Sequence, residues 1–256
     1  MESGNPALGD EAFREIDAQL KSCVDPPERA NLILRKAALY GVLERFDDAR
    51  EQLDAALKEA PEDPFTRIQF DFIAGNLDDD EGKSQKAYEH LTEALAKHAL
   101  ALIEPELRPI YENAQLRRGF NLIWLGRFQE AALILEEALS FKLNLQNRSI
   151  VLVRLGRCYT ELTEWERARG YLEDAREIGL VRESEGQAHF YLGVVYAYLG
   201  LFPESKREFQ ICEEHAAEYG VYGFSIVEVY GWLFRVCKEL GEKVEAEKYA
   251  RLARPA

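Results

Sequence analysis

The residues with the most conspicuous chemistry form an acidic run at positions 78–81, which Gly82, Lys83 and Ser84 follow directly. A glycine-lysine-serine end is typical of a phosphate-binding loop. Such a loop also needs a first glycine five residues before the second, and Leu77 stands there. Four acids would in addition repel a triphosphate. The stretch therefore does not predict a nucleotide site.

The same stretch is closer to a calcium-binding loop. Asn76, Asp78 and Asp80 alternate as chelating residues do. However, Glu81 takes the place of the turn glycine, and Ala87 stands where a bidentate acid is needed. We expect a solvated, mobile loop between two helices, with no bound ion.

Histidines and cysteines offer no second site. Cys212 and His215 lie one helical turn apart, and His90 and His98 lie two turns apart. A zinc site needs three or four converging ligands. No Ser-His-Asp or Cys-His pattern supports nucleophilic catalysis. The sequence predicts no enzyme, no cofactor and no metal.

Composition narrows the classes of partner. The formal net charge of −14 argues against nonspecific binding to nucleic acid or to an anionic membrane, because both need clustered Lys and Arg. No apolar run reaches the roughly 18 residues of a membrane span, and residues 1–20 lack the apolar stretch of a secretory signal. The four cysteines are widely spaced, which is typical of unpaired thiols in the cytoplasm.

Small residues recur along the chain and predict the elements that would position any site. Each member of one set is followed seven residues later by another small residue, and successive members lie 37 to 44 residues apart. The members are Ala49, Ala87, Ala131, Ala168, Ser205 and Ala246. A period of this length indicates a stacked repeat, in which neighbouring units bury each other's apolar faces.

Each period predicts two antiparallel helices, because breakers such as Gly126, Gly200 and Gly241 fall between apolar helical stripes. Gly156 and Gly193 lie twelve residues before members of the small set, and small residues let two helices approach closely. The expected helices are a lone one at 10–23 and pairs at 29–43 with 46–59, 63–75 with 83–101, 105–125 with 128–142, 147–162 with 165–179, 184–199 with 203–218, and 223–240 with 243–253.

The fourth pair carries a family resemblance. Its key residues are Leu155, Gly156 and Tyr159 on the first helix and Ala168, Leu172 and Ala175 on the second. This pattern resembles the tetratricopeptide repeat. The resemblance implies an all-α fold, a right-handed superhelix of about six helix-turn-helix repeats after an N-terminal helix. We expect one repeat domain over residues 10–256, after a disordered segment at 1–9, with repeats at about 29–61, 63–103, 105–143, 147–180, 184–220 and 223–254.

Function should lie on the face of each first helix that turns away from its paired helix. The positions are counted from the small residue of the first helix, such as Gly156 or Gly193. At 100° per residue, the positions six before, two before, one after and five after it share one stripe. The candidate binding residues on these stripes are Asn31, Arg35, Asn113, Arg117, Trp124, Arg154, Arg157, Gln187, Tyr191, Tyr198, Trp232 and Arg235. Alternatively, the arginines pair with acids of neighbouring repeats and the aromatic side chains pack between repeats.

Arginine binds carboxylates, and exposed aromatic side chains anchor interfaces. We therefore expect a protein or peptide partner with acidic and apolar residues, and neither nucleic acid nor membrane. The predicted function is a non-catalytic adaptor or scaffold that holds this partner in the concave groove. The alternative is a regulatory sensor whose groove binds a short signalling peptide or a small ligand.

Overall fold

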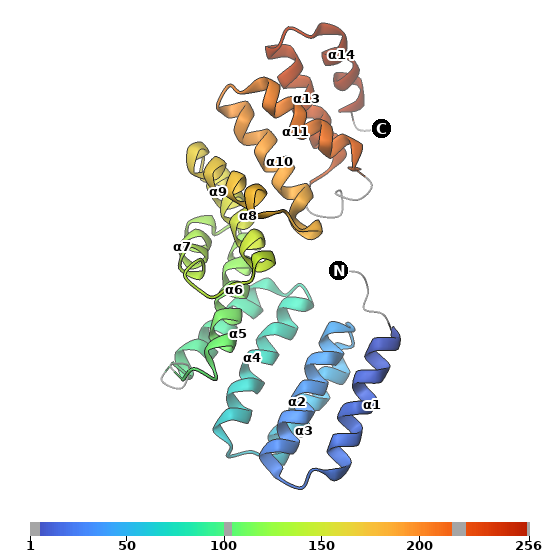
Figure 1. Cartoon of the computed structure of the whole chain (residues 1–256), viewed down its shortest axis with the longest axis vertical. Coiled ribbons are helices and arrows are strands. Elements are labelled where there is room, and N and C mark those ends of the chain that lie inside the picture. The colour runs from blue at the N-terminus through green and yellow to red at the C-terminus, as the bar shows by residue number, and fades with distance from the viewer. Residues whose placement is uncertain (1–5, 100–103, 217–223, 255–256) are drawn as a thin grey trace. The chain divides into compact units, whose positions relative to one another are not determined.

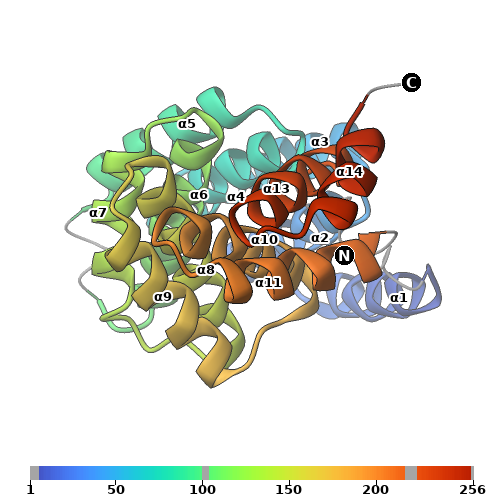
Figure 2. The ribbon, with the colours of Figure 1, turned by 90° about the horizontal axis from the view of Figure 1, so that it is seen from above.

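The computed structural model describes residues 6–99, 104–216 and 224–254. Within these residues the chain forms thirteen α-helices and no strand, which confirms the predicted all-α repeat fold. The helices belong to two compact units, unit 1 (residues 1–127) and unit 2 (residues 128–256), whose helices are labelled in Figure 1 and seen from above in Figure 2. The single repeat domain expected over residues 10–256 stays a prediction.

Unit 1 holds a lone helix, two helical hairpins and one further helix. These are α1 (Pro6–Ser22), α2 (Pro26–Val42) with α3 (Phe46–Glu59), α4 (Pro64–Asp80) with α5 (Ser84–Lys97), and α6 (Arg108–Trp124). The starts of α2 and α4 are set by their sequence. The carboxylates of Asp25 and Asp63 accept the backbone N–H groups of Glu28 and Thr66. A proline follows each cap residue, at a position where its missing N–H is harmless.

Unit 2 begins with one helix and continues with three hairpins. These are α7 (Phe128–Ala138), α8 (Leu145–Glu161) with α9 (Trp165–Ile178), α10 (Arg182–Tyr198) with α11 (Phe202–Glu214), and α13 (Ile226–Glu239) with α14 (Lys243–Leu252). The turn after α10 contains Gly200 with a φ of 75°, as expected of a helix-ending glycine. The equivalent turn after α8 contains Thr163 with a φ of 59°, which is unfavourable for a β-branched residue.

Small residues bring the two helices of a hairpin together, as predicted. A Cβ atom added to Gly156 of α8 would lie 2.4 Å from Cγ of Leu172 on α9. A Cβ added to Gly193 of α10 would lie 2.8 Å from the Phe209 ring on α11. Ser205 is fully buried at the same contact and donates its hydroxyl to the Gly193 carbonyl at 2.7 Å. The close approach leaves no room for larger side chains.

Helix ends differ from the predicted ones by a few residues in most cases. The first helix begins at Pro6 rather than at about residue 10, and residues 1–5 of the expected disordered segment lie outside the described residues. The expected helix ends at 100–101, 217–218 and 223 also lie outside them. The largest difference is in α4, which continues to Asp80 instead of ending at about residue 75.

Candidate binding face on the first helices

The predicted binding residues lie on the helices that open the repeats. In unit 1 they are Asn31 and Arg35 on α2 and Asn113, Arg117 and Trp124 on α6. In unit 2 they are Arg154 and Arg157 on α8, Gln187, Tyr191 and Tyr198 on α10, and Trp232 and Arg235 on α13. We call these residues, together with their equivalents on α4, the first-helix face.

Some of these side chains are open to solvent. Arg35 and Asn113 are exposed in unit 1, and Trp124 is 58% exposed. In unit 2, Tyr198 is 56% exposed, and Arg235 is exposed as well. These side chains form the part of each face that a ligand can reach without any change in the fold.

Arg117 is already engaged by two carboxylates of the neighbouring repeat. Its Nη1 donates to Asp79 Oδ2 at 2.7 Å and to Asp80 Oδ1 at 2.8 Å. Burial lowers the pKa of Arg117, but the Asp80 and Asp79 carboxylates outweigh this effect and the net pKa is raised. An acidic ligand would have to compete with these two carboxylates for the guanidinium.

Three candidates in unit 2 face inward between α8 and α10. Arg154 donates from Nη1 to Oε1 of Gln187, and burial and then the nearby Arg157 lower the pKa of Arg154. Gln187 is only 4% exposed and Tyr191 only 9%. These side chains therefore help to pack two repeats together and present little surface to a partner.

The aromatic residues of unit 2 also pack across repeats. Trp232 stacks on Phe209 with ring centres 5.8 Å apart, and the Trp232 and Tyr198 rings meet in a T-shaped contact with centres 5.7 Å apart. Tyr198 in turn stacks on Trp165 at 4.0 Å. Arg235 covers the Trp232 ring, with its guanidinium carbon 5.0 Å from the ring centre. Trp165, Trp232 and Phe209 thus form an aromatic base that supports the exposed side chains of Tyr198 and Arg235. Side chains held in this way are suited to anchor an interface.

Unit 1 has a pocket on its first-helix face, between α4 and α6, which pack against each other. Its volume is about 260 Å³, and no ionisable side chain lines it. Its lining consists of Gln69, Phe72, Ile73, Asn76, Pro109, Ile110 and Asn113. Of these residues, the sequence analysis identified Asn113 alone.

The α4 residues of the pocket were missed because Gly75 was not recognised as the small residue of this repeat. Gly75 lies twelve residues before Ala87 and takes the place of the small residue in this repeat, since a Cβ added to it would lie 2.8 Å from the Leu91 side chain. Counting from Gly75, the stripe positions six before, two before and one after are Gln69, Ile73 and Asn76. The repeat thus places three pocket residues on the face where binding was expected.

Another pocket of unit 1 has a different character. It has a volume of about 400 Å³ and includes Arg67, Asp71 and Lys97 in its lining. Lys97 Nζ lies 2.6 Å from Asp71 Oδ2, and Arg67 pairs with Glu62 at 3.2 Å. The charged side chains that line this pocket therefore already form ion pairs with groups of opposite charge.

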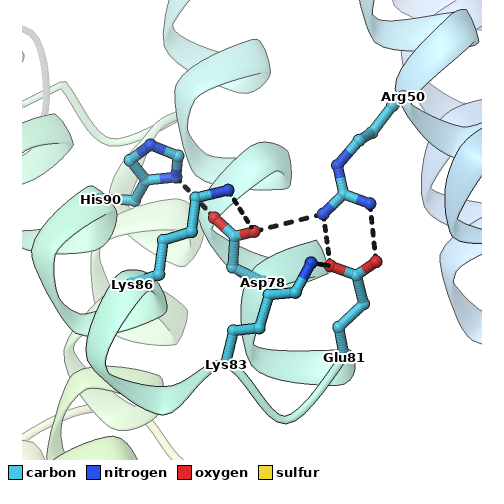
Figure 3. Close-up of polar contacts among 6 residues, drawn as sticks. All are labelled: Arg50, Asp78, Glu81, Lys83, Lys86 and His90. Atoms are coloured by element: carbon cyan, nitrogen blue, oxygen red, sulfur yellow. Dashed lines mark hydrogen bonds and ion pairs between the residues drawn. The ribbon is translucent and has the colours of Figure 1, made fainter.

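The acidic run is not the mobile, solvated loop that the sequence predicts. Asp78 belongs to the last turn of α4 and is only 1% exposed. Figure 3 shows that basic groups from two neighbouring helices surround its carboxylate. Oδ1 accepts from Lys86 Nζ at 2.9 Å and from Arg50 Nη2 at 3.2 Å, and His90 Nδ1 lies 2.8 Å from Oδ2. The prediction failed because it took a string of acids as a sign of solvation, whereas their counter-charges come from distant positions.

Glu81 continues this cluster in the turn that follows α4. Its two oxygens accept from both terminal nitrogens of Arg50, at 2.7 Å and 2.5 Å, and Lys83 Nζ lies 2.7 Å from Oε2. These hydrogen bonds, chiefly that of Arg50, lower the pKa of Glu81 to about 2. The acidic run therefore ties α4 to α3, to α5 and, through Arg117, to α6.

Cys158 and Cys212 are buried in α8 and α11. Burial raises the pKa of Cys158 and of Cys212 to about 12, so neither thiol ionises readily near neutral pH. Among the described residues, Cys237, Glu242 and Glu245 form one group of possible metal ligands. The Lys206 ammonium lies at this group, 2.6 Å from Glu242 Oε2, and also pairs with Glu245. The Lys206 ammonium therefore already pairs with both carboxylates of this group.

Comparison with known proteins identifies the repeat. The family model described as tetratricopeptide repeat matches residues 151–177, which include most of α8 and α9. No curated protein shows significant similarity to the sequence. Within the described residues, no helix is long and apolar enough to cross a membrane.

Solved structures extend the similarity over most of the chain. The structure described as pilF of Pseudomonas aeruginosa is 16% identical with a TM-score of 0.62, over 88% of this chain and 90% of that one. A tetratricopeptide repeat protein of Parabacteroides merdae is 18% identical with a TM-score of 0.58, over 89% and 81%. A signal transduction ATPase of Pyrococcus horikoshii with a tetratricopeptide repeat sensor is 17% identical with a TM-score of 0.69, over 96% of this chain and 39% of that one. The family match identifies one tetratricopeptide repeat in α8 and α9, and these solved structures show the same helical-repeat fold over most of the chain.

Proposed function

We propose that the protein is a non-catalytic adaptor whose first-helix face binds a segment of another protein. The observation that carries this proposal is the pocket between α4 and α6. Three of its α4 residues lie on the stripe expected to face away from the second helices, while Phe72 belongs to the core that α4 forms with α5. Proteins with this fold bind protein partners in general, which supports the class of function.

The accessible residues of the face support the same proposal. Asn113 lies at the pocket, and Trp124 lies three helical turns further along α6. In unit 2, Tyr198 and Arg235 are exposed above the aromatic base. Rigid aromatic side chains and arginine are the residue types that contribute most to protein interfaces. We place the protein in the cytoplasm, which its four unpaired cysteines support.

The alternative function, a sensor of a small ligand, uses the same pocket. Its volume of about 260 Å³ is below the range of typical drug-sized ligand sites, roughly 300–1,000 Å³. A side chain of a partner protein is smaller than such ligands and can enter a pocket of this volume. Protein binding is therefore the function that the pocket favours.

Site-specific photo-crosslinking in the native host tests the proposal. A benzophenone side chain replaces Asn113 or Tyr198 on the face, and Glu89 of α5 or Arg207 of α11, which are exposed on second helices, in the matched controls. We expect one partner to be captured from both face positions and from neither control. Capture of the same partner from Glu89 and Arg207 alone would refute binding at the first helices. A shift of the melting temperature with metabolites, without any captured protein, would favour the sensor.

A further inference from the structure

We infer that the pocket between α4 and α6 takes an uncharged, apolar side chain of the bound segment. The inference rests on the proposed function and adds the chemistry that the segment must have at this point. It differs from the expectation that arginines of the face, such as Arg117, bind acidic residues of the partner.

The pocket has no charged group that could pair with a carboxylate or an ammonium. Four of its side chains, those of Phe72, Ile73, Pro109 and Ile110, are apolar, and the other three carry carboxamides. A carboxylate or ammonium that entered it would lose its hydration without gaining an opposite charge. An apolar side chain gains free energy from the same transfer.

The nearest predicted cation does not change this conclusion. Arg117 follows Asn113 by one turn on α6, but its guanidinium is held by Asp79 and Asp80 at 2.7 and 2.8 Å. The positive charge on this part of α6 is therefore neutralised by the end of α4. Two carboxylates against one guanidinium leave no free positive charge on this part of the face, which favours an apolar ligand over an acidic one.

The carboxamides of the pocket suit the backbone of an extended segment. Each of Gln69, Asn76 and Asn113 offers both a donor and an acceptor, which is what a peptide group requires. Oδ1 of Asn76 is buried and meets no hydrogen-bond donor among the described residues. A buried acceptor without a partner destabilises the protein until a donor reaches it. Rotation of the Asn76 carboxamide would turn either its oxygen or its NH₂ group toward the segment.

Two capped amino acids of nearly equal shape test the inference on the intact protein. N-acetyl-leucinamide and N-acetyl-aspartamide with a free side-chain carboxylate differ mainly in two methyl groups against two carboxylate oxygens. The δ1 methyl signals of Ile73 and Ile110 report the pocket in methyl NMR spectra, and those of Ile211 and Ile226 in unit 2 serve as internal controls. A ligand of about a dozen heavy atoms should bind in the millimolar range.

We expect saturable shifts of Ile73 and Ile110 with the leucine probe, and at least about tenfold weaker binding of the aspartate probe. Asn113→Arg should reduce or invert this preference, while Asn147→Arg, the same change at an exposed asparagine of α8, should leave it unchanged. Equal binding of both probes, or no saturable shift with the leucine probe, would overturn the inference. Neither result would affect segment binding itself, which photo-crosslinking tests separately.

Discussion

Alanine at two glycines of one hairpin should have opposite effects on stability. Gly156 of α8 and Gly170 of α9 are both inside helices, so each Gly→Ala change gains about 1 kcal/mol from helix propensity. The added Cβ at Gly170 meets nothing within 4 Å, whereas at Gly156 it would lie 2.4 Å from Leu172 Cγ. Leu172 is fully buried and cannot move away freely, and such overpacking costs about 1–3 kcal/mol.

Gly170→Ala should therefore stabilise the protein by about 1 kcal/mol. Gly156→Ala should be between neutral and about 2 kcal/mol less stable than the wild type, because the packing penalty offsets the propensity gain. The difference between the two variants isolates the packing penalty, since both carry the same change of residue. Urea unfolding followed by circular dichroism and by tryptophan fluorescence measures both midpoints.

A second substitution checks that the contact with Leu172 causes the penalty. Leu172→Ala removes the side-chain atoms that the added methyl would meet, at the usual cost of about 2–5 kcal/mol for a buried leucine. In that background, Gly156→Ala should be neutral or stabilising, so the double-mutant cycle should show strong coupling. If Gly156→Ala is as stable as Gly170→Ala in the wild-type background, our account of the hairpin contact is wrong.

Four further outcomes follow from the structure. Thr163→Gly should stabilise the protein by about 1 kcal/mol in thermal unfolding, because glycine tolerates the positive φ; a loss of stability would contradict the turn geometry. Ser205→Ala should destabilise it by about 1 kcal/mol in urea, because the buried hydrogen bond to a carbonyl is lost; an unchanged midpoint would contradict this role. Glu81 stabilises the fold at pH values above its ordinary pKa of 4.5, and this contribution is lost as the pH falls toward its lowered pKa of about 2. Glu81→Gln should therefore be less stable than the wild type at neutral pH, and this difference in stability should shrink in acid. A difference in stability that does not depend on pH would refute the pairing with Arg50. Of the four free thiols, the partly exposed Cys23 alone should react quickly with a disulfide reagent at about pH 8, and the rest only in denaturant; several fast thiols would show that the helices open readily.

Much of the fold could be predicted because close helix packing restricts the residues at the contact. Gly156, Gly193 and Ala168 mark places where only small side chains fit, and they revealed both the period and the pairing of the helices. The helix α3 was predicted with its observed ends, 46–59. Local signals thus suffice where one hairpin determines its own packing.

The end of α4 could not be predicted from local signals. Asp78 is stabilised in the helix by Arg50 and Lys86, which lie 28 residues before it and 8 residues after it. Nothing near residue 78 indicates these partners, so the run of acids resembled a loop. The spacing of Gly75 from Ala87 carried the missing information, and it would have placed Ile73 and its neighbours on the binding face.

The individual roles on the face were also beyond the sequence. A helical stripe shows which residues share a side, but burial depends on how closely the next repeat packs. Tyr191 and Tyr198 share the α10 stripe, yet one is 9% exposed and the other 56%. Arg117 and Arg35 occupy equivalent positions, but Arg117 has two carboxylates within 3 Å whereas Arg35 is exposed. Only the neighbouring repeat distinguishes a packing residue from an accessible one.

The most direct test of segment binding is amide hydrogen exchange of the protein alone and with the partner captured by photo-crosslinking. Added protection should appear in peptides of α4 and α6, on both sides of the pocket, and should be smaller in α3 and α5, the second helices of the same unit. Protection concentrated in α3 and α5, with exchange of α4 and α6 unchanged, would contradict the claim that the first-helix face holds the partner.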